Sequence, residues 1–278
     1  MPICQIAYGD VFYQDAGNGT PIIFLHPPGM GRKVFRFQMP LSDKYRVIIP
    51  DLSGHGDSTA ISSSVSIKKY ADEVLLLIDF LGIEKVVLCG YSSGGSIAQE
   101  FALTYPDRTA AVILSGGFAE VESPSLKYEH LMGMYLVKHS PKTLAKVIAT
   151  AHTHEKEFRQ ELIVHMLKAD RSTWFHFYNE SLTYSCLGRL KDLSVPLLLI
   201  YGSRDFINQH FRTYERELHE FKTAFIQKVS HQVPVKKWHE FNNEVSNFLD
   251  NLNLQEQKAQ APWSAPTSAG GPTSEVVL

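Results

Sequence analysis

The sequence predicts a doubly wound α/β fold, in which helices cover both faces of a mostly parallel sheet and a block of helices is inserted between two strands. Short apolar runs alternate with segments of helical spacing before residue 119 and again after residue 191. Residues 119–191 contain no strand-like run. We therefore expect a core of residues 1–118 and 192–253, with residues 119–191 as a helical lid over the carboxyl ends of the strands.

The expected strands are short apolar runs, as buried parallel strands are. The chain begins with an alternating segment, residues 3–15, that contains a hairpin turn at residues 8–10. Further strands are expected at residues 22–25, 46–49, 86–89, 110–115, 195–201 and 223–229.

The expected helices show apolar residues at helical spacing. The clearest begins after Ser66, a suitable N-cap, and stops at Gly82. Another follows Ser92, and the remaining core helices are expected near residues 208–219 and 238–249. The lid segment predicts helices near residues 124–139, 141–151, 155–169 and 172–184.

Composition excludes several classes of protein. The 278 residues carry a formal net charge of −2 and no basic stripe, so no nucleic-acid partner is expected. We expect a cytoplasmic protein without a membrane partner, because no signal peptide and no bilayer-length apolar run is visible. The three cysteines, Cys4, Cys89 and Cys186, lie far apart and form no metal or redox motif. Residues 254–278 are rich in Ala, Pro, Ser, Thr and Gly and are expected to be disordered; no oligomeric state is indicated.

The stretch Gly90-Tyr91-Ser92-Ser93-Gly94 is a G-x-S-x-G motif at the junction of an expected strand and an expected helix. A serine there sits on a tight turn with its hydroxyl raised above the sheet edge. The N-terminus of the following helix favours negative charge at the same place. This position predicts that Ser92 is a nucleophile.

A serine nucleophile needs a base, and the base needs an orienting group. Asp205 follows the expected strand at residues 195–201, and His231 follows the next one. The order Ser92, Asp205, His231, with each residue after a strand, predicts a catalytic triad. Two alternatives stay open for the acid, since Glu120 or Glu122 could replace Asp205 and Asp205 could cap a helix.

Residues 1 to about 253 resemble the α/β-hydrolase superfamily, in its lidded serine esterase-like branch. The motifs that carry the resemblance are His26-Pro27-Pro28-Gly29-Met30, Asp51-Leu52-Ser53-Gly54-His55-Gly56-Asp57-Ser58, the Gly90–Gly95 stretch, Gly202-x-x-Asp205, and His231 followed ten residues later by Phe241-Asn242. The resemblance implies triad chemistry without a metal or organic cofactor. His55 is expected to be a turn and packing residue, and the lid histidines His152, His154, His165 and His176 match no metal spacing.

The resemblance also implies an oxyanion hole with two backbone donors. One is the N–H of Ser93, the residue after the nucleophile. An ungapped match places Pro28 at the second position, and proline has no N–H. We therefore expect Gly29 or Met30 to donate instead, or the hole to be one donor short.

Aromatic and methionine side chains in the lid predict a mainly apolar substrate pocket, with Met134, Trp174 and Phe177 as candidate lining residues. The expected function is hydrolysis of small, largely apolar carboxylic esters or lactones through an acyl-enzyme on Ser92. Other triad chemistry stays open: C–C bond hydrolysis, perhydrolysis, acyl transfer or a lyase reaction. A protein of another class, a slow-turnover ligand sensor that retains the triad, is the second hypothesis.

Overall fold

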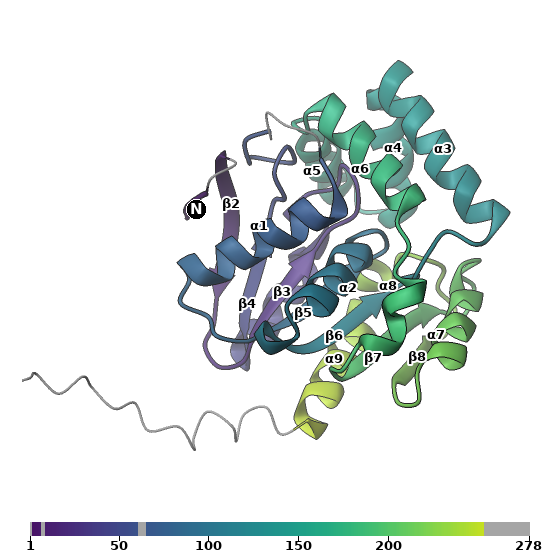
Figure 1. The fold of residues 1–278 in the computed structure, drawn as a ribbon. Coiled ribbons are helices and arrows are strands. Elements are labelled where there is room, and N and C mark those ends of the chain that lie inside the picture. The colour runs from purple at the N-terminus through teal and green to yellow at the C-terminus, as the bar shows by residue number, and fades with distance from the viewer. Residues whose placement is uncertain (1, 7–8, 61–64, 253–278) are drawn as a thin grey trace, which may run out of the picture.

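One sheet organises the molecule, and the computed structural model describes it over residues 2–6, 9–60 and 65–252. Its strands are β1 (Ile3–Ile6), β2 (Gly9–Ala16), β3 (Pro21–Leu25), β4 (Arg46–Pro50), β5 (Val86–Tyr91), β6 (Thr109–Ser115), β7 (Leu197–Gly202) and β8 (Lys222–Ile226). They lie in the order β1-β2-β4-β3-β5-β6-β7-β8. β1 and β2 are antiparallel to their neighbours, and the strands from β4 to β8 are parallel. The predicted doubly wound, mostly parallel sheet is confirmed (Figure 1).

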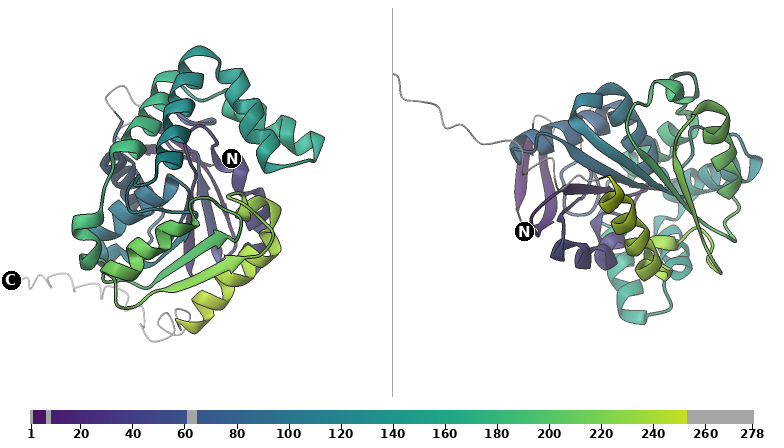
Figure 2. Two further views of the ribbon diagram at one scale, coloured as in Figure 1. Left: turned by 90° about the vertical axis from the view of Figure 1, so that its right-hand side faces the viewer. Right: turned by 90° about the horizontal axis from the view of Figure 1, so that it is seen from below.

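Helices cover both faces of this sheet. Apart from the four α-helices that directly follow β6, the described helices are α1 (Ile67–Phe80), α2 (Gly94–Thr104), α7 (Phe211–Glu217), α8 (Val233–Lys236), α9 (Trp238–Asn251) and the 3₁₀ segments η1 (Arg32–Asp43), η2 (Pro106–Arg108), η3 (Leu187–Asp192) and η4 (Asn208–His210). Seen from below in Figure 2, the blue helices α1 and α2 lie on one side of the sheet and the yellow α9 on the other. Of the described helices, none has the length and apolar character needed to cross a bilayer.

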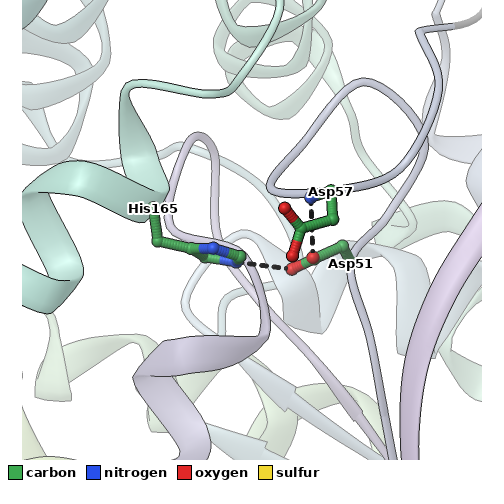
Figure 3. A group of neighbouring side chains, drawn as sticks. All are labelled: Asp51, Asp57 and His165. Atoms are coloured by element: carbon green, nitrogen blue, oxygen red, sulfur yellow. Dashed lines mark hydrogen bonds and ion pairs between the residues drawn. The ribbon is translucent and has the colours of Figure 1, made fainter. Parts of the chain in front are cut away.

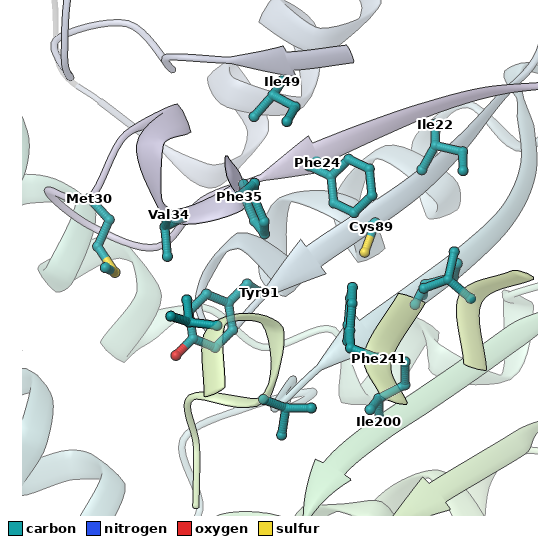
Figure 4. Packing of buried hydrophobic residues seen from close by; sticks show 14 of the residues in the cluster. Ile22, Phe24, Met30, Val34, Phe35, Ile49, Cys89, Tyr91, Ile200 and Phe241 are labelled. Atoms are coloured by element: carbon teal, nitrogen blue, oxygen red, sulfur yellow. The ribbon is translucent and has the colours of Figure 1, made fainter. Parts of the chain in front are cut away.

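Alternation along the strands separates two hydrophobic clusters. In β3, Ile23 and Leu25 belong to the cluster that also contains residues of α1 and α2. Ile22 and Phe24 point to the other face and pack with Phe35 of η1 (Figure 4). Because side chains of a strand alternate between faces, a strand buried on both faces is apolar throughout, as β3 is.

The boundaries of α1 follow from its terminal residues. The Ser66 hydroxyl accepts a hydrogen bond from the backbone N–H of Lys69 at 3.1 Å, which caps the first turn. Gly82 has a φ of 64°, a conformation that ends the helix at little cost for glycine. Both ends agree with the sequence prediction.

Four α-helices lie between β6 and β7: α3 (Pro124–His139), α4 (Pro141–His152), α5 (Lys156–Met166) and α6 (Arg171–Thr183). Figure 1 shows them together at one end of the sheet. They include residues that line the cavity beside Ser92, such as Gly133 of α3 and Ile148 of α4. Their position fits the predicted lid; the division of the chain into core and lid stays a prediction.

The structure differs from the prediction at β8 and at η1. The strand expected at residues 223–229 ends at Ile226, because Lys228 adopts a φ of 62° that no strand allows. The twelve-residue η1 has no counterpart in the prediction. The hairpin turn at residues 8–10 falls partly on residues 7–8, and the predicted tail on 254–278; both stretches lie outside the described residues.

Candidate active site

Ser92 occupies a strained turn between β5 and α2. Its φ is 52°, a left-handed conformation that is uncommon for a residue with a side chain. Its backbone N–H donates to the carbonyl of Ser115 on β6 at 2.8 Å, which ties the turn to the sheet. A Cβ at Gly90 would collide with Gly95, and one at Gly94 with the carbonyl oxygen of Leu25. The glycines of the motif are therefore required by close backbone packing.

His231 and Asp205 form a hydrogen-bonded pair. The Nδ1 atom of His231 lies 2.8 Å from Oδ2 of Asp205, and Asp205 is buried after the end of β7. The other carboxylate oxygen accepts from the N–H of Ile207 at 3.2 Å, which fixes its orientation. A Cβ at Gly116 would lie 2.5 Å from the His231 ring, so glycine makes room for the imidazole.

The charge of Asp205 raises the pKa of the His231 imidazole. Burial lowers the pKa of His231, but the negative charge of Asp205 and its hydrogen bond outweigh burial and raise the pKa above its usual value. Because Asp205 accepts from Nδ1, the neutral ring carries its proton on Nδ1 and leaves Nε2 free to accept one. That is the tautomer a general base for Ser92 requires.

The two alternative acids lie elsewhere. Glu120 accepts a hydrogen bond from the hydroxyl of Ser185 at 2.6 Å. Glu122 is 3.3 Å from the hydroxyl of Thr213, on α7. Asp205 is therefore the carboxylate that this structure pairs with His231.

A cavity of about 270 Å³ adjoins Ser92 and His231. Its wall is mostly apolar and comes from the loop after β3, the turn at Ser92, α3, α4, α6 and the loop of His231. The lining residues are Pro27, Pro28, Met30, Tyr91, Ser92, Ser93, Glu129, His130, Met132, Gly133, Leu136, Leu144, Val147, Ile148, Ala151, His152, Tyr178, His231 and Gln232.

The three side chains predicted for the pocket do not line this cavity. Trp174 is buried against Gly29, where a Cβ would collide with the indole ring. Phe177 packs in the core beside Tyr70 and His55. Met134 is half-buried on α3. The methionine and the aromatic side chain of α3 and α6 that do line the cavity are Met132 and Tyr178.

The three predicted oxyanion donors, Ser93, Gly29 and Met30, differ in whether they line the cavity and whether their N–H groups are free. Ser93 and Met30 line the cavity, whereas Gly29 is not among its lining residues. The Met30 N–H donates to the carbonyl of Pro27 at 3.3 Å, so it is already engaged. Ser93 stands at the start of α2, where N–H groups have no partner within the helix. Ser93 is thus the better placed donor of the three.

Two histidines in the cavity wall were missed by sequence reasoning. His130 accepts from the Ser93 hydroxyl at Nε2, over 3.3 Å, and His152 accepts from the Tyr91 hydroxyl at Nε2, over 2.9 Å. The signal that would have found this wall is the spacing on α4, where Leu144, Val147, Ile148 and Ala151 recur at i, i+3, i+4 and i+7.

A second polar cluster joins α5 to the loop after β4. Oδ1 of Asp51 lies 2.9 Å from Nε2 of His165, and Arg32 forms ion pairs with both Asp51 and Asp57. Figure 3 shows His165, Asp51 and Asp57 pointing toward one another. Their ligand atoms lie within 4.8 Å, a spacing compatible with a metal ion. Arg32 and Lys168 already supply the positive charge there, so the cluster fits an ionic contact between α5 and the loop after β4 better than a metal site.

His55 is fully buried and lies edge-on to His26 at 5.0 Å between ring centroids. This agrees with its predicted packing role. The three cysteines are free and buried.

Comparison with known proteins places these features in a family. Residues 20–161 match the sequence profile described as alpha/beta hydrolase fold. A 2-hydroxy-6-oxononadienedioate/2-hydroxy-6-oxononatrienedioate hydrolase of Paraburkholderia phymatum is 32% identical over 219 residues, which cover 70% of this chain and 74% of the relative.

Two solved structures share the fold. A thermophilic esterase from Thermogutta terrifontis superposes with a TM-score of 0.77 at 24% identity, over 90% of this chain and 97% of the esterase. The enol-lactonase from Burkholderia xenovorans superposes with a TM-score of 0.79 at 20% identity, over 90% of this chain and all of that one. With the profile match covering half of its length, the chain belongs to the α/β-hydrolase family.

Proposed function

We propose that this protein is a serine hydrolase that cleaves small, largely apolar carboxylic esters or lactones through an acyl-enzyme on Ser92. One observation carries the proposal. Ser92, held in a left-handed turn, and His231, paired with Asp205, line the same apolar cavity. A nucleophile, a base and an orienting carboxylate beside an apolar binding site are the components of acyl transfer.

The reaction begins with proton transfer. Nε2 of His231 takes the proton of the Ser92 hydroxyl as its oxygen bonds to the substrate carbonyl carbon. The resulting imidazolium is stabilised by Asp205 at 2.8 Å. It then gives the proton to the leaving alkoxide as the C–O bond breaks. Water, activated by the same imidazole, releases the carboxylic acid and regenerates Ser92.

The developing oxyanion is stabilised by the N-terminus of α2. The N–H of Ser93 and the dipole of this eleven-residue helix favour negative charge beside Ser92. Pro28 lines the cavity at the position from which relatives are expected to supply a second donor, and it has no N–H. Losing one such donor costs roughly 10²–10³ in turnover, so we expect a modest enzyme.

The same loop favours the second candidate, a ligand-binding protein that is acylated and turns over slowly. Loss of an oxyanion donor slows deacylation as well as acylation, because both steps pass through a tetrahedral oxyanion. A third candidate, hydrolysis of a C–C bond in a dioate, is suggested by the name of the Paraburkholderia relative.

Hydrolysis of p-nitrophenyl esters of graded acyl length, by the parent protein and by Ser92→Ala, tests the proposal. We expect multiple turnovers that fall by at least about 10⁴-fold in the variant. A burst of one equivalent followed by a stall would favour the slow-turnover protein. Unchanged turnover in Ser92→Ala would refute the acyl-enzyme mechanism.

A further inference from the structure

In the part of the chain that the structure describes, the lining of the cavity beside Ser92 includes an acidic side chain but no lysine or arginine. Of the described residues that line it, Glu129 on α3 is the one carboxylate, and none is a lysine or an arginine. Glu129 lines the cavity and is an exposed residue, so solvent screens part of its charge. A bound carboxylate would therefore meet a like charge and find no lysine or arginine among these residues, with His231 as the one ring that can carry positive charge there.

The two lid histidines supply no compensating positive charge. Nδ1 of His130 is 2.9 Å from the carbonyl oxygen of Leu126, and Nδ1 of His152 is 2.8 Å from that of Ile148. Each Nδ1 therefore carries the proton, and each Nε2 is an acceptor. Burial lowers the pKa of His130 and lowers that of His152 to about 4, so both rings are neutral at neutral pH.

The two hydroxyl groups that bind these histidines also become hydrogen-bond acceptors toward the cavity. Ser93 donates its hydroxyl proton to His130, and Tyr91 donates its own to His152. Both hydroxyl groups are thereby left with lone pairs rather than protons to offer. Together with Glu129, the polar groups from α3 and α4 form an acceptor-rich side of the cavity wall, which suits a substrate group that is uncharged, cationic or a hydrogen-bond donor.

The negative charge of Glu129 contributes to the pKa values of His231 and Tyr178. Burial lowers the pKa of His231, Asp205 raises it, and Glu129 adds to the rise. Glu129 also adds to the rise in the pKa of Tyr178 that burial causes. An anion bound between these residues would be repelled by the negative charge of Glu129.

We propose that Glu129 is a specificity-determining residue, and that the cavity accepts neutral and cationic acyl groups and rejects acyl groups that end in a carboxylate. The proposal rests on the serine hydrolase function above and narrows its substrate class. It also separates this chain from the Paraburkholderia relative, whose name gives a dioate substrate.

Three p-nitrophenyl esters of similar length test the proposal: the valerate, the hydrogen glutarate and 4-(trimethylammonio)butyrate. For the parent protein we expect kcat/KM for the glutarate to be at least about tenfold below that for the valerate, with the cationic ester close to the valerate or above it. Glu129→Gln is expected to raise the ratio of the glutarate kcat/KM to the valerate kcat/KM about five- to tenfold, whatever the variant's overall rate. Because Glu129 is exposed, added salt is expected to reduce the ratio of the valerate to the glutarate kcat/KM in the parent protein.

Glu157→Gln is the matched control. Glu157 is exposed on α5 and is not among the cavity-lining residues, so the same change in net charge is expected to leave all three values unchanged. Equal preference in the parent and in Glu129→Gln, or a glutarate value equal to the valerate value, would overturn the role of Glu129.

Binding separates this proposal from the hydrolase function. If none of the esters is turned over, the hydrolase function fails. Charge selection is then measured as the Kd of each ester for Ser92→Ala and for Ser92→Ala combined with Glu129→Gln. Weaker binding of the glutarate that is relieved by the second substitution supports charge selection; equal affinities refute it.

Discussion

Two aspartate–histidine pairs of nearly equal length lie in different surroundings in this molecule. His231 and Asp205 are 2.8 Å apart, and His165 and Asp51 are 2.9 Å apart. The first pair engages Nδ1 of its histidine and lies at a cavity with Ser92. The second engages Nε2 of its histidine and lies between α5 and the loop after β4.

The surroundings of each carboxylate explain the difference. Asp51 also accepts from the backbone N–H of Arg32 at 2.7 Å and from that of Asp57 at 2.9 Å, and the Arg32 guanidinium pairs with it. Burial alone would raise the pKa of Asp51, but His165 and Arg32 lower it to about 2. Asp205 binds the N–H of Ile207 and its histidine, so its charge remains available to an imidazolium. The contrast teaches that a carboxylate–imidazole contact is suited to catalysis by its environment rather than by its length.

The largest expected effect is on turnover. Asp205→Asn is expected to lower kcat by about 10⁴, because an amide in place of the carboxylate favours the wrong imidazole tautomer. His165→Ala, at the other pair, is expected to lower kcat far less and to act mainly on stability. Steady-state kinetics on both variants, with circular dichroism to confirm folding, check this. Equal losses of kcat would erase the distinction between the pairs.

The second effect is on stability. Asp51→Asn is expected to lower the free energy of unfolding by up to about 3–5 kcal/mol, because the buried Arg32 would keep the partly exposed Asp57 but lose its buried counter-charge. Urea denaturation measures the loss. Asp15→Asn removes a partly exposed partner of Arg46 and is expected to cost at most about 1 kcal/mol. A similar small cost for Asp51→Asn would show that the cluster does not stabilise the contact between α5 and the loop after β4.

The third prediction concerns pH. His231 must be neutral to accept the Ser92 proton, and its pKa is raised, so kcat/KM should rise with pH through an apparent pKa above 6.5. Asp205→Asn should move this inflection down. The same shift stabilises the fold fully below the unfolded-state pKa of 6.5, and this contribution is lost as pH rises through the folded-state pKa. An inflection at or below 6.5 in the parent would contradict the pairing.

The smallest effect is expected at the cavity wall. Tyr91→Phe removes the hydroxyl that donates to His152 and is expected to cost about 1 kcal/mol of stability. Turnover of neutral esters should change by less than about tenfold, since the Tyr91 hydroxyl does not take part in the proposed proton transfers. Thermal unfolding and ester kinetics measure both; a loss like that of Asp205→Asn would give Tyr91 a catalytic role.

Local signals predicted the sheet and the turn at Ser92 because strands, caps and close glycine contacts are fixed by neighbouring residues. Ser66 and Gly82 bound α1 as expected. The cavity wall was harder to predict. Whether Trp174 faces the cavity or packs on Gly29 depends on how α6 is rotated against a loop far away in sequence. The contact of His165 with Asp51 spans 114 residues, and no local pattern encodes it.

The most direct test is active-site labelling with a fluorophosphonate, followed by mass spectrometry and by the rate of labelling in variants. We predict one adduct, on Ser92, formed much more slowly in His231→Ala and at close to the parent rate in folded His165→Ala. An adduct on another residue, or labelling of Ser92→Ala at the parent rate, would contradict this prediction.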